Sequence, residues 1–299
     1  MTDRVLFVGP GRMGLALGYA LWQADATTEL TYCGRRPDPP SHPLFTQGLA
    51  NYHFGLVHPG FATTAVFLSV PDDVLPEMAH ALAGQGAAPD GCSAFHLSGA
   101  LSSDVLAPLH ARGYAVGTFH PLQSVAHPVT GAERLPGSYF ALSGERAAVQ
   151  VARRLVGQLA GSILTIPVTR RPLYHAAAVT ASNYLAAILA LAGRLLVHAG
   201  VPEDEALPAL LPLARGTLAN IADMGLADAL TGPVARGDVE TIRLHLRTME
   251  PREREVYRAL GRELVDLVTA RGQVDADVGD EMRELLRPEE PVKESEARP

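Results

Sequence analysis

The sequence predicts an α/β protein, in which a Rossmann-type doubly wound, mostly parallel sheet precedes an all-α C-terminal domain. An apolar run at residues 5–8 leads into a glycine-rich turn and then into an apolar helical pattern. Strand and helix patterns alternate from there to about residue 166, which is typical of a doubly wound sheet. Beyond Pro172 only helical patterns remain.

The glycine-rich turn has the spacing G-x-G-x-x-G between an expected strand and an expected helix. In this order the first glycine permits a tight turn, the second lets the backbone approach a pyrophosphate, and the third lets helix and strand pack closely. The N-terminus of the helix then faces the anion. The residues expected to contact a dinucleotide here are Gly9, Pro10, Gly11, Arg12, Met13 and Gly14.

The end of the next strand, expected at residues 29–33, indicates which dinucleotide binds. NAD-binding domains carry an Asp or Glu about 20 residues past the glycines, on the ribose 2′-hydroxyl. This chain has Gly34, Arg35 and Arg36 there. Two guanidinium groups suit a 2′-phosphate, so we predict NADP as the cofactor. The alternative is a basic surface turn that leads into the prolines from Pro37 onward.

Further strands are expected at residues 65–70, 93–97, 114–119, 138–142 and 162–166, with a helix at 145–159. Helices are expected at residues 173–199, 203–224, 236–249, 251–271 and 276–286. We therefore predict an NADP-binding Rossmann domain at 1–167, a helical substrate and dimerisation domain at 168–286, and a disordered tail at 287–299.

Composition narrows the function classes. The net charge of −7 argues against a nucleic-acid partner. Cys33 and Cys92 are the two cysteines, and neither C-x-x-C nor H-E-x-x-H occurs, so we expect no disulfide framework and no metal site. The N-terminal residues lack the long apolar region of a signal peptide, and we expect a cytoplasmic protein.

One segment, residues 176–193, carries no charged side chain over 18 positions, which is long enough for a membrane span. It is rich in alanine and contains Thr180, Ser182, Asn183 and Tyr184. We expect a buried helix of a soluble protein with no membrane partner. The same helix is a candidate for the interface of a homodimer.

Two strand ends and one turn supply candidate binding residues. Ser69, Val70 and Pro71 follow the strand at 65–70 and are expected to line the cofactor, because ligands bind beyond the carboxyl ends of parallel strands. The alternative is a helix start at Pro71. Arg236 is a candidate for binding a substrate carboxylate, although an N-cap by Asp238 is the favoured interpretation of that turn.

Histidines supply the candidate acid/base chemistry. His120 follows the strand at 114–119, and an ordinary histidine pKa near 6.5 suits proton transfer. The alternative is a histidine bonded only to loop backbone. Gln123 and Ser124 follow it as candidate substrate ligands.

A second candidate group lies on the long expected helix. At 100° per residue, Ser182 falls within about 20° of His175, with Asn183 near the same face. These side chains form either a polar row that faces a cleft or a polar seam between helices.

Several segments, taken together, match a known family. They are H-L-S-G-A at 96–100, H-P-L-Q-S at 120–124, L-Y-H-A-A-A at 173–178, S-N-Y at 182–184 and L-T-G-P-V-A-R-G-D at 230–238. Over about residues 4–270 the chain resembles a family of candidate NADP oxidoreductases, in which a Rossmann domain precedes a helical domain of unknown function. It is more distantly similar to pyrroline-5-carboxylate reductase, ketopantoate reductase and prephenate dehydrogenase.

The resemblance implies roles and limits. It implies that Ser98 faces nicotinamide and substrate, with an ordinary strand-to-helix turn as the alternative, and that His120 lies in a segment similar to the catalytic one of prephenate dehydrogenases. Ketopantoate reductase uses a Lys four residues before an Asn on the comparable helix. Here that position, four before Asn183, is Val179. The mechanism of that enzyme therefore does not transfer.

These observations give one leading hypothesis and one alternative. The leading hypothesis is an NADP-dependent oxidoreductase that transfers a hydride between NADP(H) and a small polar carbonyl, imine or hydroxy substrate. His120 is the expected proton donor, His175 a second acid/base or orienting group, and Ser98 and Asn183 the substrate-positioning groups. The alternative is an NADP-binding regulatory or scaffold protein without turnover.

Overall fold

The computed structural model describes residues 3–289 and divides into two compact units, with the division between Asn183 and Tyr184. Of the tail expected at 287–299, residues 290–299 lie outside the described range. The division falls beyond the boundary expected at 167/168. The reason is that the first turns of the long helix are fixed to the sheet by side chains described below, so they belong to the first unit.

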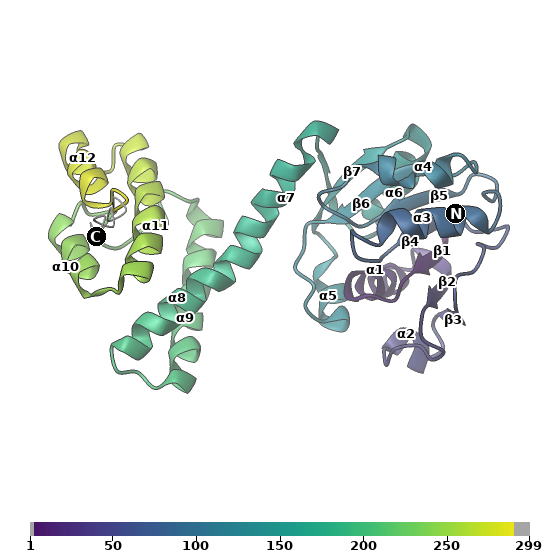
Figure 1. Cartoon of the computed structure of the whole chain (residues 1–299), viewed down its shortest axis with the longest axis horizontal. Helices are drawn as coiled ribbons and strands as arrows, with labels where there is room; N and C mark the ends of the chain where they lie inside the picture. Colours follow the sequence, from purple (N-terminus) through teal and green to yellow (C-terminus); the bar gives the residue numbers. More distant parts are fainter. Residues whose placement is uncertain (1–2, 290–299) are drawn as a thin grey trace, which may run out of the picture. The chain divides into compact units, whose positions relative to one another are not determined.

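The first unit is built on one eight-stranded sheet with the order β3-β2-β1-β4-β5-β6-β7-β8 (Figure 1). All neighbouring strands are parallel except β6 and β7, which are antiparallel. This confirms the predicted doubly wound, mostly parallel sheet. The strands are β1 Asp3–Val8, β2 Thr27–Gly34, β3 Asn51–Phe54, β4 Ala65–Leu68, β5 Ser93–His96, β6 Ala115–Pro121, β7 Tyr139–Gly144 and β8 Ser162–Thr165.

Helices cover both faces of this sheet. Side chains of α1, α5 and α6 pack into one hydrophobic cluster, and those of α3 and α4 pack into a second cluster with the opposite faces of the strands. The helices are α1 Arg12–Gln23, α2 Pro43–Thr46, α3 Leu75–Gly84, α4 Ala107–His110, α5 Pro128–Arg134, α6 Arg146–Gln158 and α7 Arg171–Val179. Sequence patterns missed β3, α2, α4 and α5, all of which are short elements.

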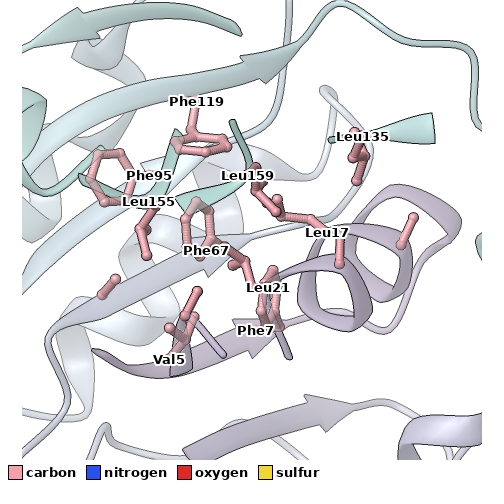
Figure 2. Close-up of a cluster of buried hydrophobic side chains, with 14 of the residues drawn as sticks. Val5, Phe7, Leu17, Leu21, Phe67, Phe95, Phe119, Leu135, Leu155 and Leu159 are labelled. Atoms are coloured by element: carbon pink, nitrogen blue, oxygen red, sulfur yellow. The ribbon is translucent and has the colours of Figure 1, made fainter. Parts of the chain in front are cut away.

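A row of phenylalanines runs across the middle of the sheet (Figure 2). Phe7, Phe67 and Phe95 are paired in register on β1, β4 and β5. Their rings stack with centroid distances of 5.1 and 5.2 Å. The leucines that cover the row are Leu17, Leu21, Leu135, Leu155 and Leu159. This core holds the carboxyl ends of the central strands in fixed positions.

The second unit is helical, as predicted. Its elements are α8 Leu185–His198, α9 Glu203–Met224, α10 Val239–Thr248, α11 Pro251–Ala270 and α12 Ala276–Leu285. The last three helices share a core that contains Ile242, Val265, Val268 and Met282. In contrast, α8 and α9 pair with each other but bury only Leu191 and Ala206.

The expectation of a buried helix at residues 176–193 is wrong for the single chain. Within the helical segment Val168–His198, the most apolar 18-residue window has a mean hydropathy of 1.5, and 6% of that window is buried. Its length and composition would allow it to cross a membrane, which for one helix is weak evidence. The cause is that α8 and α9, although they pair, bury only one side chain each. Exposed apolar side chains on these helices and the turn before them include Tyr184, Ile188, Val197, Leu207, Leu213 and Leu218.

The phenylalanine row generates a stability prediction. We expect Phe67→Ala to lower the free energy of unfolding of the first unit by about 3–5 kcal/mol, because it removes a fully buried ring and leaves a cavity. Trp22, the one tryptophan of the chain, lies on α1, so its fluorescence during urea unfolding reports on this unit. Phe61→Ala is the matched control, since Phe61 is 93% exposed, and it should change stability by less than about 0.5 kcal/mol. Equal effects of the two substitutions would contradict the assignment of the core.

Candidate functional site

The glycine turn after β1 is pressed against the end of β4. Gly9 has φ of +98°, and its N–H donates to the Cys33 carbonyl at 2.9 Å. A Cβ on Gly9 would stand 2.9 Å from the Ser69 carbonyl oxygen, and a Cβ on Gly14 would overlap the Ser69 hydroxyl. Larger residues would therefore push the turn away from the sheet. The backbone at this turn is left open to close approach by a ligand.

The N-terminus of α1 follows directly and lacks any side-chain cap. Gly11 is the N-cap residue, no side chain caps the helix, and its first turn holds no acidic residue. Free N–H groups and the helix dipole favour an anion at such an end. Arg12, in the first turn, is exposed. The turn and the helix end together fit a phosphate group.

Arg35 and Arg36 lie beside this turn. β1 and β2 are parallel with Val8 opposite Cys33, and a Cβ on Gly34 would stand 3.0 Å from Cδ of Pro10. The Tyr52 hydroxyl donates to the Arg36 carbonyl at 2.7 Å and holds the turn. Both arginines are exposed, and within residues 3–289 neither makes an ion pair. They are available to bind a further phosphate at the end of β2.

Ser69, by contrast, is occupied by the protein itself. Its hydroxyl donates to the Gly9 carbonyl at 2.5 Å and so locks the glycine turn. Val70 packs against Gly9, while Pro71 is exposed. The helix expected to start at Pro71 begins only at Leu75, after a turn closed by a bond from Val74 N–H to the Pro71 carbonyl.

Ser98 is also committed to local structure. Its hydroxyl donates to Oδ2 of Asp72 at 2.6 Å and accepts the N–H groups of Ala100 and Leu101 at 3.2 Å. Its backbone N–H donates to Nδ1 of His96 at 3.2 Å. The geometry favours the turn interpretation of Ser98 over direct contact with a ligand.

His96 is fully buried beside it. Its Nε2–H donates to the Ser102 carbonyl at 2.9 Å while Nδ1 accepts from Ser98, so both ring nitrogens are satisfied in the neutral form. Burial lowers the pKa of His96 to about 4.

His120, Tyr174 and His175 come together at the carboxyl end of β6. His120 Nδ1 and the Tyr174 hydroxyl share a hydrogen bond of 2.7 Å, and the two histidine rings lie 6.2 Å apart between centroids. A Cβ on Gly99 would stand 2.8 Å from Nε2 of His120 and 2.6 Å from Nδ1 of His175. Gly99 is therefore required for this approach. His175 Nδ1 is buried without a hydrogen-bond partner.

Arg171, the first residue of α7, holds these side chains in place. It is completely buried, and its guanidinium donates to the Ser98 carbonyl at 3.0 Å, the Thr118 hydroxyl at 3.1 Å and the Ser143 hydroxyl at 3.3 Å. All three acceptors are neutral. In the described part of the chain no carboxylate pairs with Arg171, and its Nε has no partner. Burial lowers the pKa of this guanidinium.

This charge shapes the chemistry of His120. Burial, followed by the charge of Arg171 and electrostatic interaction with His175 and His96, lowers the pKa of His120 to about 4. An ordinary value near 6.5, assumed from the sequence, therefore does not apply in the folded protein. At neutral pH the side chain is a neutral imidazole.

Gln123 and Ser124, two other predicted site residues, are not part of the group formed by His120, Tyr174, His175 and Arg171. The amide of Gln123 donates to the Arg134 carbonyl and the Ser138 hydroxyl, both at 3.2 Å, and accepts the Ser124 N–H at 2.9 Å. These bonds tie the loop together. Ser124 itself is exposed.

Ser182 and Asn183 lie in a π-helical turn, Thr180–Tyr184, where both are exposed. The wider turn breaks the 100° spacing that was expected to align Ser182 with His175. The expected single helix at 173–199 is thus two α-helices, α7 and α8, joined by this turn. Such turns are frequent at functional sites.

Arg236 belongs to the helical unit and is exposed. The neighbouring Asp238 caps α10, since its carboxylate accepts the Thr241 N–H at 3.0 Å. This is the N-cap favoured from the sequence.

Sequence reasoning assigned no role to Arg171 or Tyr174. Nothing in the sequence distinguishes Arg171 from its neighbour Arg170, whereas Tyr174 could have been found because it precedes His175 in one of the matching segments.

Among residues 3–289 no cluster of three or more potential metal ligands occurs. A hollow of about 370 Å³ lies elsewhere on the first unit and is lined by residues that include Arg4, Glu29, His53 and Phe61.

The position of His120 generates a prediction about pH. Its ring resonances should stay constant from pH 8 to about 5.5 and move only near pH 4, whereas in urea they should titrate near 6.5. Because the folded-state pKa is lowered, the stability this residue contributes is present above pH ~6.5 and is lost as the pH falls toward ~4. NMR titration of the labelled protein measures the pKa, with His120→Gln to assign the signal. A folded-state midpoint above pH 6 would be inconsistent with this electrostatic environment.

Comparison with known proteins places these features in context. A Rossmann-like domain model matches residues 3–121, and the model of a domain of unknown function, DUF2520, matches residues 138–264. A comparison with curated proteins finds no match.

Solved structures share the fold at low sequence identity. Protein TM1727 from Thermotoga maritima is 23% identical, with a TM-score of 0.69 over 90% of this chain and 99% of its own. A candidate NADP oxidoreductase from Bacteroides fragilis is 20% identical, with a TM-score of 0.65 over 88% and 98%. Plasmodium falciparum pyrroline carboxylate reductase, with NADP bound, is 12% identical, with a TM-score of 0.60 over 95% and 98%. These findings confirm the resemblance seen in the sequence: the chain combines a match to the Rossmann-like model with a match to the DUF2520 model that runs from β7 into α11.

Proposed function

We propose that this protein is an NADP-dependent oxidoreductase, which transfers a hydride between NADP(H) and a small polar carbonyl, imine or hydroxy substrate. The observation that carries the proposal is the glycine turn with an uncapped helix N-terminus and two exposed arginines beside it. The Bacteroides fragilis protein, described as a candidate NADP oxidoreductase, and the NADP-bound Plasmodium falciparum reductase have the same fold and support it.

The residues present fit the cofactor. The turn from Gly9 to Gly14 would hold the pyrophosphate on backbone N–H groups, and Arg35 and Arg36 would bind the 2′-phosphate. When bound, NADP supplies the acceptor or donor of the hydride.

The chain itself must position the substrate and move a proton. We assign these roles to His120 and His175 because their rings lie close together beside Gly99. This place is at the carboxyl ends of β5 and β6, on the same side of the sheet as the carboxyl end of β1 and its glycine turn. Ser98 supports them indirectly, through its carbonyl bond to Arg171.

We also propose that the protein forms a homodimer through its helical part. The apolar side chains left uncovered on α8 and α9 require a partner surface, and a second copy presents the same apolar surface in return.

The arginine pair predicts cofactor preference. NADPH should raise the melting temperature more than NADH at equal concentration, and Arg35→Ala combined with Arg36→Ala should abolish the difference. Loss of charge-assisted bonds to the 2′-phosphate should weaken NADPH binding at least about tenfold. Arg153→Ala, which removes an exposed arginine on α6, should keep the difference. Equal shifts by the two cofactors in the parent protein would refute the proposed preference.

Turnover is tested with NADPH and a panel of keto acids, aldehydes and cyclic imines, followed by nicotinamide absorbance. We expect at least one member to be reduced, and His120→Gln to lower kcat/KM by about 10²-fold or more. Tight NADPH binding without reduction of any member would instead identify an NADP-binding regulatory or scaffold protein.

Sedimentation tests the assembly. The parent should sediment as a particle of twice the 31.7 kDa chain mass. Leu213→Lys, at a 69% exposed position on α9, should produce monomers, whereas Leu244→Lys, at a 60% exposed position on α10, should not. A monomeric parent, or one that binds lipid vesicles through this surface, would contradict the dimer.

A further inference from the structure

The hydroxyl of Tyr174 occupies one ring nitrogen of His120, and this pairing indicates where the imidazole proton lies. Oη and Nδ1 are 2.7 Å apart, and the two rings are nearly perpendicular at 89°. A phenol is the better donor of this pair and a neutral imidazole nitrogen the better acceptor. The Tyr174 O–H therefore donates to Nδ1, and the proton of the neutral ring resides on Nε2.

The Nε2 atom of His120 is not enclosed by the described part of the protein and is not occupied by a hydrogen bond from it. Nε2 makes no hydrogen bond within residues 3–289, and it is not among the atoms that are both buried and unpartnered. A side chain on Gly99 would crowd this atom, because its Cβ would stand 2.8 Å away. Nε2–H is thus a donor that a bound molecule can reach, with the Tyr174 hydroxyl behind it.

The buried charge of Arg171 adds a preference for negative charge near this pair. Arg171 and Tyr174 are three residues apart on α7, and the guanidinium favours the ionised phenol although burial raises the Tyr174 pKa overall. The charged or titratable groups that act on His120 are Arg171, His175 and His96, and none of them is negative. An uncompensated cation disfavours a second cation at the same place.

We propose that Tyr174 and His120 form a proton relay that serves a carbonyl substrate rather than a cationic iminium. The inference rests on the proposed function. As negative charge develops on the substrate oxygen, that oxygen takes the proton from Nε2 while Nδ1 takes the proton from Tyr174. The N–H bond at Nε2 and the O–H bond of Tyr174 break, and an N–H bond at Nδ1 and an O–H bond on the product form.

His120 is neutral before and after this step, and the negative charge ends on the Tyr174 oxygen near Arg171. A proton from water then binds to Nε2 while the Nδ1 proton returns to the Tyr174 oxygen, which restores both the phenol and the first tautomer of the ring. The electron pair that reduces the carbonyl carbon comes from the reduced cofactor. In this arrangement a neutral imidazole can pass on a proton without first becoming an imidazolium.

NMR of the histidine ring nitrogens tests the relay without turnover. In the full chain at pH 7 we expect the His120 proton on Nε2, and Tyr174→Phe should shift the ring toward a mixture of tautomers. This substitution removes the hydroxyl and keeps the aromatic contact. Tyr139→Phe is the matched control, since Tyr139 is 51% exposed, and it should leave the tautomer unchanged. A proton on Nδ1 in the parent, or an unchanged tautomer after Tyr174→Phe, overturns the proposal.

Kinetics provide the second measurement. With the best carbonyl of the panel, Tyr174→Phe should lower kcat by at least about tenfold and leave KM within about twofold, while Tyr139→Phe changes neither. Faster reduction of a cyclic imine than of its matched ketone overturns the assigned substrate class. If no compound is reduced, the proposed function fails, and the tautomer measurement still decides whether Tyr174 directs the His120 proton.

Discussion

The buried guanidinium of Arg171 is the interaction on which the candidate site depends. It joins the start of α7 to the Ser98 carbonyl after β5 and to the hydroxyls of Thr118 and Ser143 on β6 and β7. The two hydroxyls also share a hydrogen bond of 2.9 Å. One side chain thus fixes a helix to β6, to β7 and to the segment that follows β5. Tyr174 and His175, one turn along that helix, are brought to His120 as a consequence.

A buried charge without a counter-ion is costly, and its surroundings respond to it. His96 is held neutral by two hydrogen bonds that use both ring nitrogens, and His120 is neutral beside Tyr174. The nearest acidic group in the hydrogen-bond network, Asp72, is engaged by Ser98 rather than by Arg171. The site therefore keeps a positive potential that favours negative charge on a ligand. This buried charge lowers the stability of the fold, and the large apolar core offsets that loss.

Local sequence patterns predict seven of the eight strands, the glycine turn and the position of the arginines after β2, because each depends on residues within a few positions of one another. The candidate site was less accessible to this reasoning. Arg171 bonds to partners 53 and 73 residues away, and no local pattern encodes such contacts. Ser98 is a predicted ligand, whereas its hydroxyl is bonded to Asp72, 26 residues earlier. The π-helical turn likewise defeated the assumption of uniform helical spacing at Ser182 and Asn183.

Sheet order explains why the two halves of the candidate site can serve one ligand. The glycine turn follows β1, Ser69 follows β4, Ser98 follows β5, and His120 lies at the end of β6. In the sheet these strands are consecutive and parallel, so all four positions lie along one edge of one rigid unit. Three interstrand spacings separate the first strand from the last, about 14 Å. A ligand anchored by phosphates at the glycine turn must therefore extend across β4 and β5 to reach His120. The phosphate of a mononucleotide is too short to span this distance. An elongated dinucleotide with a small substrate at its far end fits it.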